Sequence, residues 1–189
     1  HDRLIESELL LKQSRVEEKL GQYPKALRWA SRARTAIEGI ASPEALRQVS
    51  QISAWYCMVM QQTGKVEDAV RWAKRTIAEA KASGDQDALG SAYIVQAWAC
   101  RARGEPGVEQ HLREALDVFQ RAGNLVRQPA VLSNLGVACQ LEGRWDDAVF
   151  FAAGHVPSVN RLMINPIFGG GANPVRQNQW VRMGPMLIR

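Results

Sequence analysis

Leu135-Gly136, followed by Gly143-Arg144-Trp145-Asp146-Asp147-Ala148, is the segment that most clearly predicts how this chain folds. Gly136 is small enough to let two helices approach closely, and Gly143 can adopt the left-handed backbone that ends a helix. Trp145 then covers the turn, and Ala148 fits where the second helix leaves little room. The segment therefore predicts a helical hairpin, two antiparallel helices joined by a turn at Gly143.

The same pattern recurs along the chain, so the hairpin is a repeat. The turn glycines are separated by 43, 40 and 39 residues, and each lies between two amphipathic segments; they are Gly21, Gly64, Gly104 and Gly143. Self-similarity at a fixed period of this size is typical of solenoids. The third unit is looser than the others because its turn, residues 103–107, contains Pro106 and a second glycine.

Helix start and stop signals place eight helices, and no segment alternates with the period of two that a strand requires. Ser42, Asp85 and Asn124 stand where helix caps are expected, and Pro129 is expected to delay the seventh helix. We therefore predict an all-α fold, a right-handed superhelical solenoid of about four antiparallel hairpins within residues 1–153. The hairpins are expected at about 4–41, 42–84, 85–123 and 124–153, with helices near 4–20, 23–39, 43–62, 66–82, 86–103, 107–121, 126–142 and 145–153.

Helical periodicity stops after Phe151. From Gly154 onward there are four arginines (Arg161, Arg176, Arg182 and Arg189), four prolines, five glycines and no acidic residue. We expect an irregular or disordered basic tail over residues 154–189. The alternatives are an arm that contacts RNA or a membrane, and out-of-frame translation after a disruption of the gene. A truncated fourth hairpin would leave Leu135, Val149 and Phe150 poorly covered, so we expect the C-terminal end of the array to fray.

The order of Leu-Gly, a turn glycine, an aromatic residue two positions later and then Ala resembles the tetratricopeptide repeat, although the period here exceeds that family's usual length of about 34 residues. The segments Leu10-Leu11-Lys12-Gln13 with Gly21-Gln22-Tyr23, and Ser133 to Ala148, are also similar to the C-terminal repeats of large bacterial proteins. Those proteins join a class III adenylate or guanylate cyclase domain to a signal-transduction ATPase. The resemblance covers about residues 4–152 and implies a sensor or scaffold arm that regulates such a domain.

Composition and charge narrow the function classes. The chain is 46% hydrophobic and 23% charged, as in ordinary soluble proteins. No apolar run reaches the roughly 18 to 20 residues that cross a membrane, and the first residues, His1-Asp2-Arg3, do not have the character of a signal peptide. We therefore expect a cytoplasmic protein and, because the first residue is His1 rather than Met, a piece of a longer polypeptide. All 19 acidic residues precede Gly154, so the tail carries four of the five net positive charges and the rest of the chain is nearly neutral, which argues against a nucleic-acid partner.

No set of residues has the spacing of a catalytic, metal or cofactor site. The three histidines are far apart, the three cysteines show no paired spacing, and the pairs Glu17-Glu18 and Asp146-Asp147 point in different directions on their helices. The glycine run at residues 169–171 lacks the strand and the Lys of a phosphate-binding loop. We predict a non-enzymatic module without cofactors that binds a protein or peptide, including other domains of the same polypeptide. The alternative is a fragment of a nucleotide cyclase or of a signal-transduction ATPase or transcriptional activator.

In a solenoid, the first helix of each hairpin lines the concave surface, where such arrays take a peptide or a helix. We expect a polar groove with basic edges there; Met58 and Trp98 either face the partner or pack on adjacent helices. Some repeats of this family grip a C-terminal carboxylate through a fixed Lys and Asn, but Leu11 and Arg15 stand at two of those places. The predicted concave residues are Glu8, Leu11, Arg15, Lys19, Gln51, Met58, Gln61, Gln62, Ser91, Ile94, Trp98, Arg101, Ser133, Val137 and Gln140.

Overall fold

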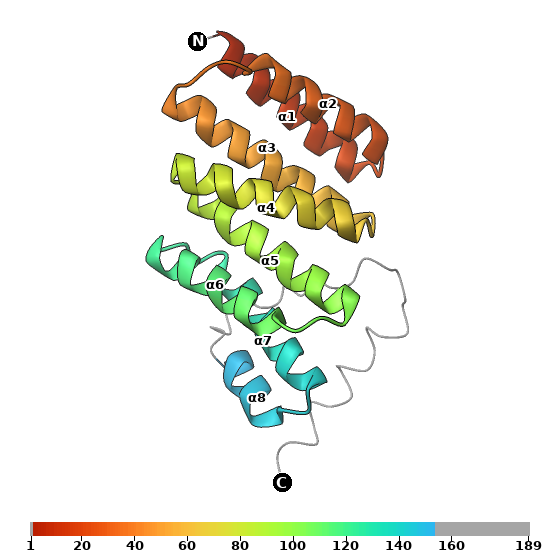
Figure 1. The fold of residues 1–189 in the computed structure, drawn as a ribbon, viewed down its shortest axis with the longest axis vertical. Coiled ribbons are helices and arrows are strands. Elements are labelled where there is room, and N and C mark those ends of the chain that lie inside the picture. The colour runs from red at the N-terminus through yellow and green to blue at the C-terminus, as the bar shows by residue number, and fades with distance from the viewer. Residues whose placement is uncertain (1, 154–189) are drawn as a thin grey trace.

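The computed structural model describes residues 2–153, and this part of the chain is entirely helical. Its helices pair into four hairpins that stack from the N-terminal to the C-terminal end (Figure 1). The helices are α1 (Asp2–Lys19), α2 (Tyr23–Ala36), α3 (Pro43–Gln62), α4 (Val66–Ser83), α5 (Gln86–Arg103), α6 (Val108–Arg121), α7 (Gln128–Leu141) and α8 (Trp145–Ala153). The all-α solenoid is as predicted, whereas the predicted tail lies outside the described residues.

The helix ends follow the local signals closely. Ser42 caps α3 by accepting a hydrogen bond from the Ala45 N–H at 3.2 Å, and Asp85 caps α5 by accepting one from Ala88 at 3.0 Å. Pro129 lies in the first turn of α7, where its missing N–H has no intrahelical partner to lose, so the helix begins at Gln128 instead of 126. Asn124 accepts from the Arg127 N–H at 3.2 Å inside the preceding turn and does not cap the helix itself.

α2 ends three residues before the predicted position. Ile37 is almost completely buried, and the chain turns there before Gly39 takes a φ of 78°. Ending α2 early allows Ile37 to be buried in the core. This burial contributes more to stability than an extension of the helix would, because helix propensity is worth less than a kcal/mol per residue.

One repeat position holds each hairpin together. It is occupied in the first helices by Ser14, Cys57, Ala97 and Gly136. Ser14 donates a hydrogen bond to the Ala26 carbonyl at 2.7 Å, and the Cys57 thiol lies 3.7 Å from the equivalent carbonyl of Ala69. A Cβ added to Gly136 would lie 3.4 Å from the Ala148 carbonyl. The second helix thus passes so close that only small side chains fit.

The hydrophobic core runs through the array in two main clusters that share α5. Ala92 and Val95 of α5 pack with residues of α1 to α4, whereas Ile94 and Ala97 pack with residues of α6 to α8. Between hairpins, α1 contacts α3 and α3 contacts α5, so the first helices of the first three hairpins adjoin one another, whereas α7 contacts the array mainly through α6 and its own partner α8. This arrangement places equivalent side chains of successive first helices in rows.

Candidate functional site

The row formed by Arg15, Met58, Trp98 and Val137 is the centre of the predicted binding surface. These residues stand at one repeat position of α1, α3, α5 and α7, separated by the same 43, 40 and 39 residues as the turn glycines. Arg15 is exposed, Met58 is 36% exposed, and Trp98 and Val137 are half-buried. The row therefore offers one cation and three apolar side chains to a partner.

The other predicted residues divide by their exposure. Those that remain accessible are mostly polar and flank the central row, and we call the accessible set, row included, the first-helix face. It consists of Glu8, Arg15, Lys19, Gln51, Met58, Gln62 and Ser133, which are exposed, and Ser91, Trp98, Arg101, Val137 and Gln140, which are half-buried.

Leu11, Gln61 and Ile94 do not contribute to this face, because their side chains are buried. Leu11 and Ile94 stand at the same repeat position and belong to the two core clusters, whereas Ser133, at that position of the fourth hairpin, is exposed. Trp98 also packs against the first cluster, which agrees with the alternative that it is partly a packing residue. Met58 keeps a larger exposed fraction and is the most accessible apolar residue of the row.

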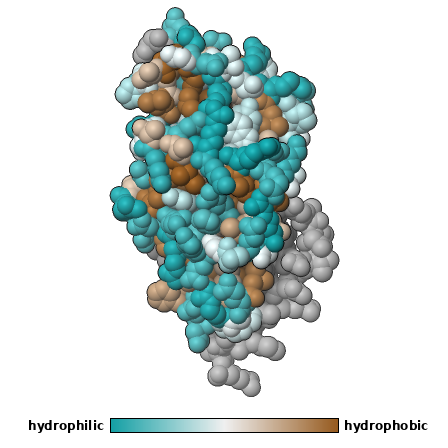
Figure 2. All heavy atoms as spheres, viewed as in Figure 1, coloured by the Kyte–Doolittle hydropathy of each residue, from teal (hydrophilic) through white to brown (hydrophobic). Residues whose placement is uncertain are grey.

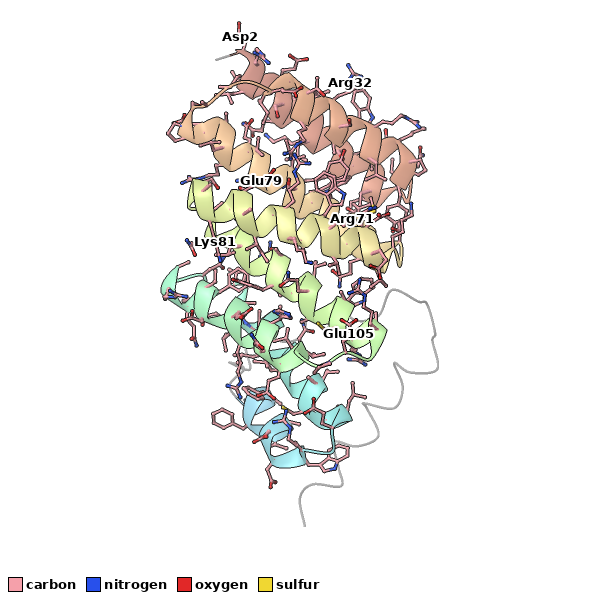
Figure 3. All side chains as sticks on the ribbon, viewed as in Figure 1. Asp2, Arg32, Arg71, Glu79, Lys81 and Glu105 are labelled. Carbon is pink, nitrogen blue, oxygen red and sulfur yellow. The ribbon has the colours of Figure 1, made fainter. Side chains whose placement is uncertain are left out.

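A network of charged and hydroxyl groups, which the sequence did not reveal, joins α2, α3 and α4. Arg34 donates to Glu79 at 2.6 Å and to the Ser53 hydroxyl at 2.7 Å, and Ser53 donates to the other Glu79 oxygen at 2.5 Å. Arg75 donates to Glu79 at 2.9 Å. Figure 3 shows Glu79 on the side of α4 that faces α3. Burial raises the pKa of Glu79, but the hydrogen bonds from Arg34, Ser53 and Arg75 outweigh it and leave that pKa below its usual value.

A pocket of about 490 Å³ lies beside this network, between α2, α3 and α4. Its wall includes Tyr56 and Trp72, whose rings stack with centroids 4.2 Å apart, and the Arg75 guanidinium lies 5.3 Å from the Trp72 ring. Tyr56 also donates to the Leu27 carbonyl at 3.1 Å. These contacts fix the first hairpin on the second. Trp72 stands 43 residues after Trp29, at the equivalent position of the repeat.

Cys57 and one member of each acidic pair considered as a candidate site are buried or engaged in an ion pair, as residues with a structural role are. Burial raises the pKa of the Cys57 thiol to about 12, so it stays protonated near neutral pH. Glu18 is buried, and Asp147 accepts a hydrogen bond from Arg144 at 2.7 Å. Within residues 2–153 no three His, Cys, Asp or Glu side chains are grouped as metal ligands would be. His1, His155 and the glycine run at 169–171 lie outside the described residues.

None of the helices in residues 2–153 is both long enough and apolar enough to cross a membrane.

Comparisons with known proteins also find a helical repeat in this chain. Residues 129–149 match the family model of the tetratricopeptide repeat, which covers the segment around Gly136 and Gly143. The array as a whole has the tetratricopeptide-repeat fold, as two solved structures show. A search of curated proteins gives no match to the sequence.

The first structure is the apo form of RapI, with a TM-score of 0.69, 16% identity, and coverage of 82% of this chain and 42% of RapI. The second is a signal transduction ATPase with numerous domains from Pyrococcus horikoshii that carries a tetratricopeptide repeat sensor. It has a TM-score of 0.66, 15% identity, and coverage of 84% of this chain and 24% of the ATPase. The chain thus spans less than half of either protein, and at these identities the likeness concerns the fold.

Proposed function

We propose that this chain is a non-catalytic interaction module that binds a protein or peptide on its first-helix face. The observation that carries the proposal is the central row, in which Met58 stays exposed between polar neighbours on a surface that the adjoining first helices α1, α3 and α5 build together. Repeat arrays use such extended surfaces for recognition, since each hairpin adds one side chain to the row.

The module acts as the sensor or regulatory arm of a larger bacterial signalling protein in the cytoplasm. Support comes from the second solved structure, a signal transduction ATPase that carries a tetratricopeptide repeat sensor. Support also comes from the similarity of residues 4–152 to the repeats that follow cyclase and ATPase domains. In this role the partner bound by the first-helix face is another protein or another domain of the same polypeptide.

Site-specific photo-crosslinking tests the binding face. A photoreactive amino acid replaces Met58 on α3 or, as the matched control, Ala78, which is exposed on α4 outside the first-helix face. We expect a discrete adduct from position 58 and none from position 78. The adducted protein is then identified and purified, and Met58→Glu should weaken its binding about tenfold or more, which corresponds to about 1.4 kcal/mol, whereas Ala78→Glu should not.

The proposal fails if both positions give the same adducts, or if a folded Met58→Glu protein binds the identified partner with unchanged affinity. Circular dichroism of both variants establishes that they are folded. Because both positions are exposed and both changes introduce the same charge, a difference between them reports the surface and not net charge.

A further inference from the structure

The pocket of about 490 Å³ between α2, α3 and α4 lies where the first hairpin meets the second, and we call it the joint pocket. It shares no residue with the first-helix face, so a partner bound on that face does not account for it. Its volume falls within the range of about 300–1,000 Å³ that is usual for small-molecule sites. In Figure 2 hydrophilic residues cover most of the visible surface and leave only separate apolar patches between them. The composition of the pocket wall therefore decides what it can bind.

The polar groups beside the joint pocket are specific to this joint. Arg34 and Ser53 stand at the positions that Ile77 and Tyr93 occupy one hairpin later. Ile77 and Tyr93 pack against an apolar cluster formed by α4, α5 and α6. Apolar side chains thus close the second joint where the first joint has a guanidinium and a hydroxyl group. Stacking of hairpins does not by itself require charged groups at these positions.

Two guanidinium groups line the joint pocket and share one carboxylate. Arg34 donates through Nη1 to Ser53 and through Nη2 to Glu79. Arg75 donates through Nε to the same Glu79 oxygen. A guanidinium has five N–H donors, so both groups keep donors that no described residue accepts. The carboxylate of a ligand can accept them in charge-assisted hydrogen bonds, which are stronger than neutral ones.

The balance of charge around the pocket also favours an anion. Glu38 belongs to the wall, but its side chain is exposed, and Arg3 donates to its backbone carbonyl at 2.9 Å. The wall and its hydrogen-bond partners therefore hold three cations, Arg3, Arg34 and Arg75, against two acids, Glu38 and Glu79. One positive charge is left, which the carboxylate of a single ligand would neutralise.

Another part of the wall is aliphatic. It includes Ile40 and Val49, which are half-buried, and Ile37, which is buried. Covering the exposed part of such side chains is favourable, by roughly 25 cal/mol for each Å² of apolar surface removed from water. A ligand that fills the pocket therefore has to combine a negative charge with an apolar body.

We propose that the joint pocket binds a small aliphatic carboxylate. The carboxylate group accepts hydrogen bonds from Arg34 and Arg75, and the hydrocarbon body lies against Ile40 and Val49. Such a ligand contacts α2, the loop that follows it, α3 and α4 together, so its binding stabilises the joint between the first two hairpins. It leaves the first-helix face open to a protein or peptide.

Isothermal titration calorimetry with a series of simple ligands tests the chemistry of the pocket. Hexanoate should bind about tenfold more tightly than butyrate, because it has two more CH₂ groups to bury. Hexanamide has the same body without the charge, and it should bind at least about tenfold more weakly than hexanoate. Inorganic phosphate, an anion without an apolar body, should also bind more weakly.

Substitutions test the location. Arg75→Gln should weaken the binding of hexanoate at least about tenfold, and because 51% of the Arg75 side chain is exposed the chain should still fold. The matched control is Arg71→Gln, one turn earlier on α4, where the arginine pairs with Asp68 and does not line the pocket. It should leave the affinity unchanged. Ile40→Ser should reduce the difference between hexanoate and butyrate while Arg34 and Arg75 stay in place.

Hydrogen exchange shows which helices the ligand stabilises. Hexanoate should raise protection in α2, α3 and α4 and leave α7 and α8 unchanged. The proposal is overturned if hexanoate does not bind, if hexanamide or inorganic phosphate binds as tightly, or if protection rises equally in all helices. Unchanged affinity in a folded Arg75→Gln protein, or an equal loss in Arg71→Gln, would also overturn it; circular dichroism establishes that the variants are folded.

Discussion

Gly90 of α5 faces the ring of Phe119 of α6, and this pair sets how closely the third hairpin closes. A Cβ at position 90 would overlap the Phe119 ring, and Phe119 is fully buried. Gly136 occupies a looser place, since its added Cβ would keep an ordinary contact distance of 3.4 Å from the Ala148 carbonyl. Packing therefore requires a glycine at position 90, whereas position 136 requires only a small side chain.

Substituting each of these glycines by alanine should therefore have opposite effects. We expect Gly90→Ala to lower the free energy of unfolding by about 1–3 kcal/mol, because the buried ring must move to admit the methyl group. Gly136→Ala should be neutral or stabilising by up to about 1 kcal/mol, since alanine favours the helix and the space accepts it. Urea denaturation followed by circular dichroism measures both. Equal changes would show that Phe119 does not constrain position 90.

At the scale of the helices, the sequence was sufficient where a signal is local. Turn glycines, Ser42, Asp85 and Pro129 placed the helix ends to within a few residues, because caps and backbone conformation depend on neighbours in the chain. The binding face was harder to predict. Leu11 lies beside exposed residues on α1 and Ile94 beside half-buried residues on α5, and only the position of the neighbouring helices shows that these two side chains are buried. Arg34 and Glu79 are 45 residues apart, so no local pattern could pair them.

The Arg34–Glu79 pair should make the contact between the first two hairpins depend on pH. The pKa of Glu79 is lowered in the folded chain, so its contribution to stability is present above the unfolded pKa of about 4.3 and is lost as pH falls through the folded value. We expect Glu79→Gln to cost about 1–3 kcal/mol near pH 7 and progressively less below pH ~4. Urea denaturation across this pH range measures the difference.

Asp117→Asn is the control for the Glu79 substitution. Asp117 pairs with Arg121 on the surface of α6, where both side chains are mostly exposed, so its loss should cost less than about 1 kcal/mol at any pH. A constant penalty for Glu79→Gln from pH 7 down to strongly acidic solution would mean that the carboxylate charge is not what the network requires.

Because the core of the molecule is divided at α5, the free energy of local unfolding can differ between the two ends of the array. The first cluster draws on five helices, whereas the C-terminal end relies on α7 and on the short α8. Val149 and Phe150 are 58% and 73% exposed there, as expected, and Leu141 is 62% exposed, whereas the expectation that Leu135 is poorly covered was wrong, since its side chain is fully buried. In an array whose hairpins contact only their neighbours, an end with less buried surface opens first.

Hydrogen exchange should therefore show lower protection in α7 and α8 than in α3 and α4, by about tenfold or more, equivalent to about 1.4 kcal/mol in opening free energy. Leu135→Ala removes a fully buried side chain of the second cluster, so it should lower protection in α7 and α8 while leaving α1 and α2 unchanged. Ile52→Ala, which removes a fully buried side chain of the first cluster, should instead lower protection in α1 to α4. If Leu135→Ala lowers protection equally in all eight helices, the array unfolds as one cooperative unit and the boundary at α5 has no energetic meaning.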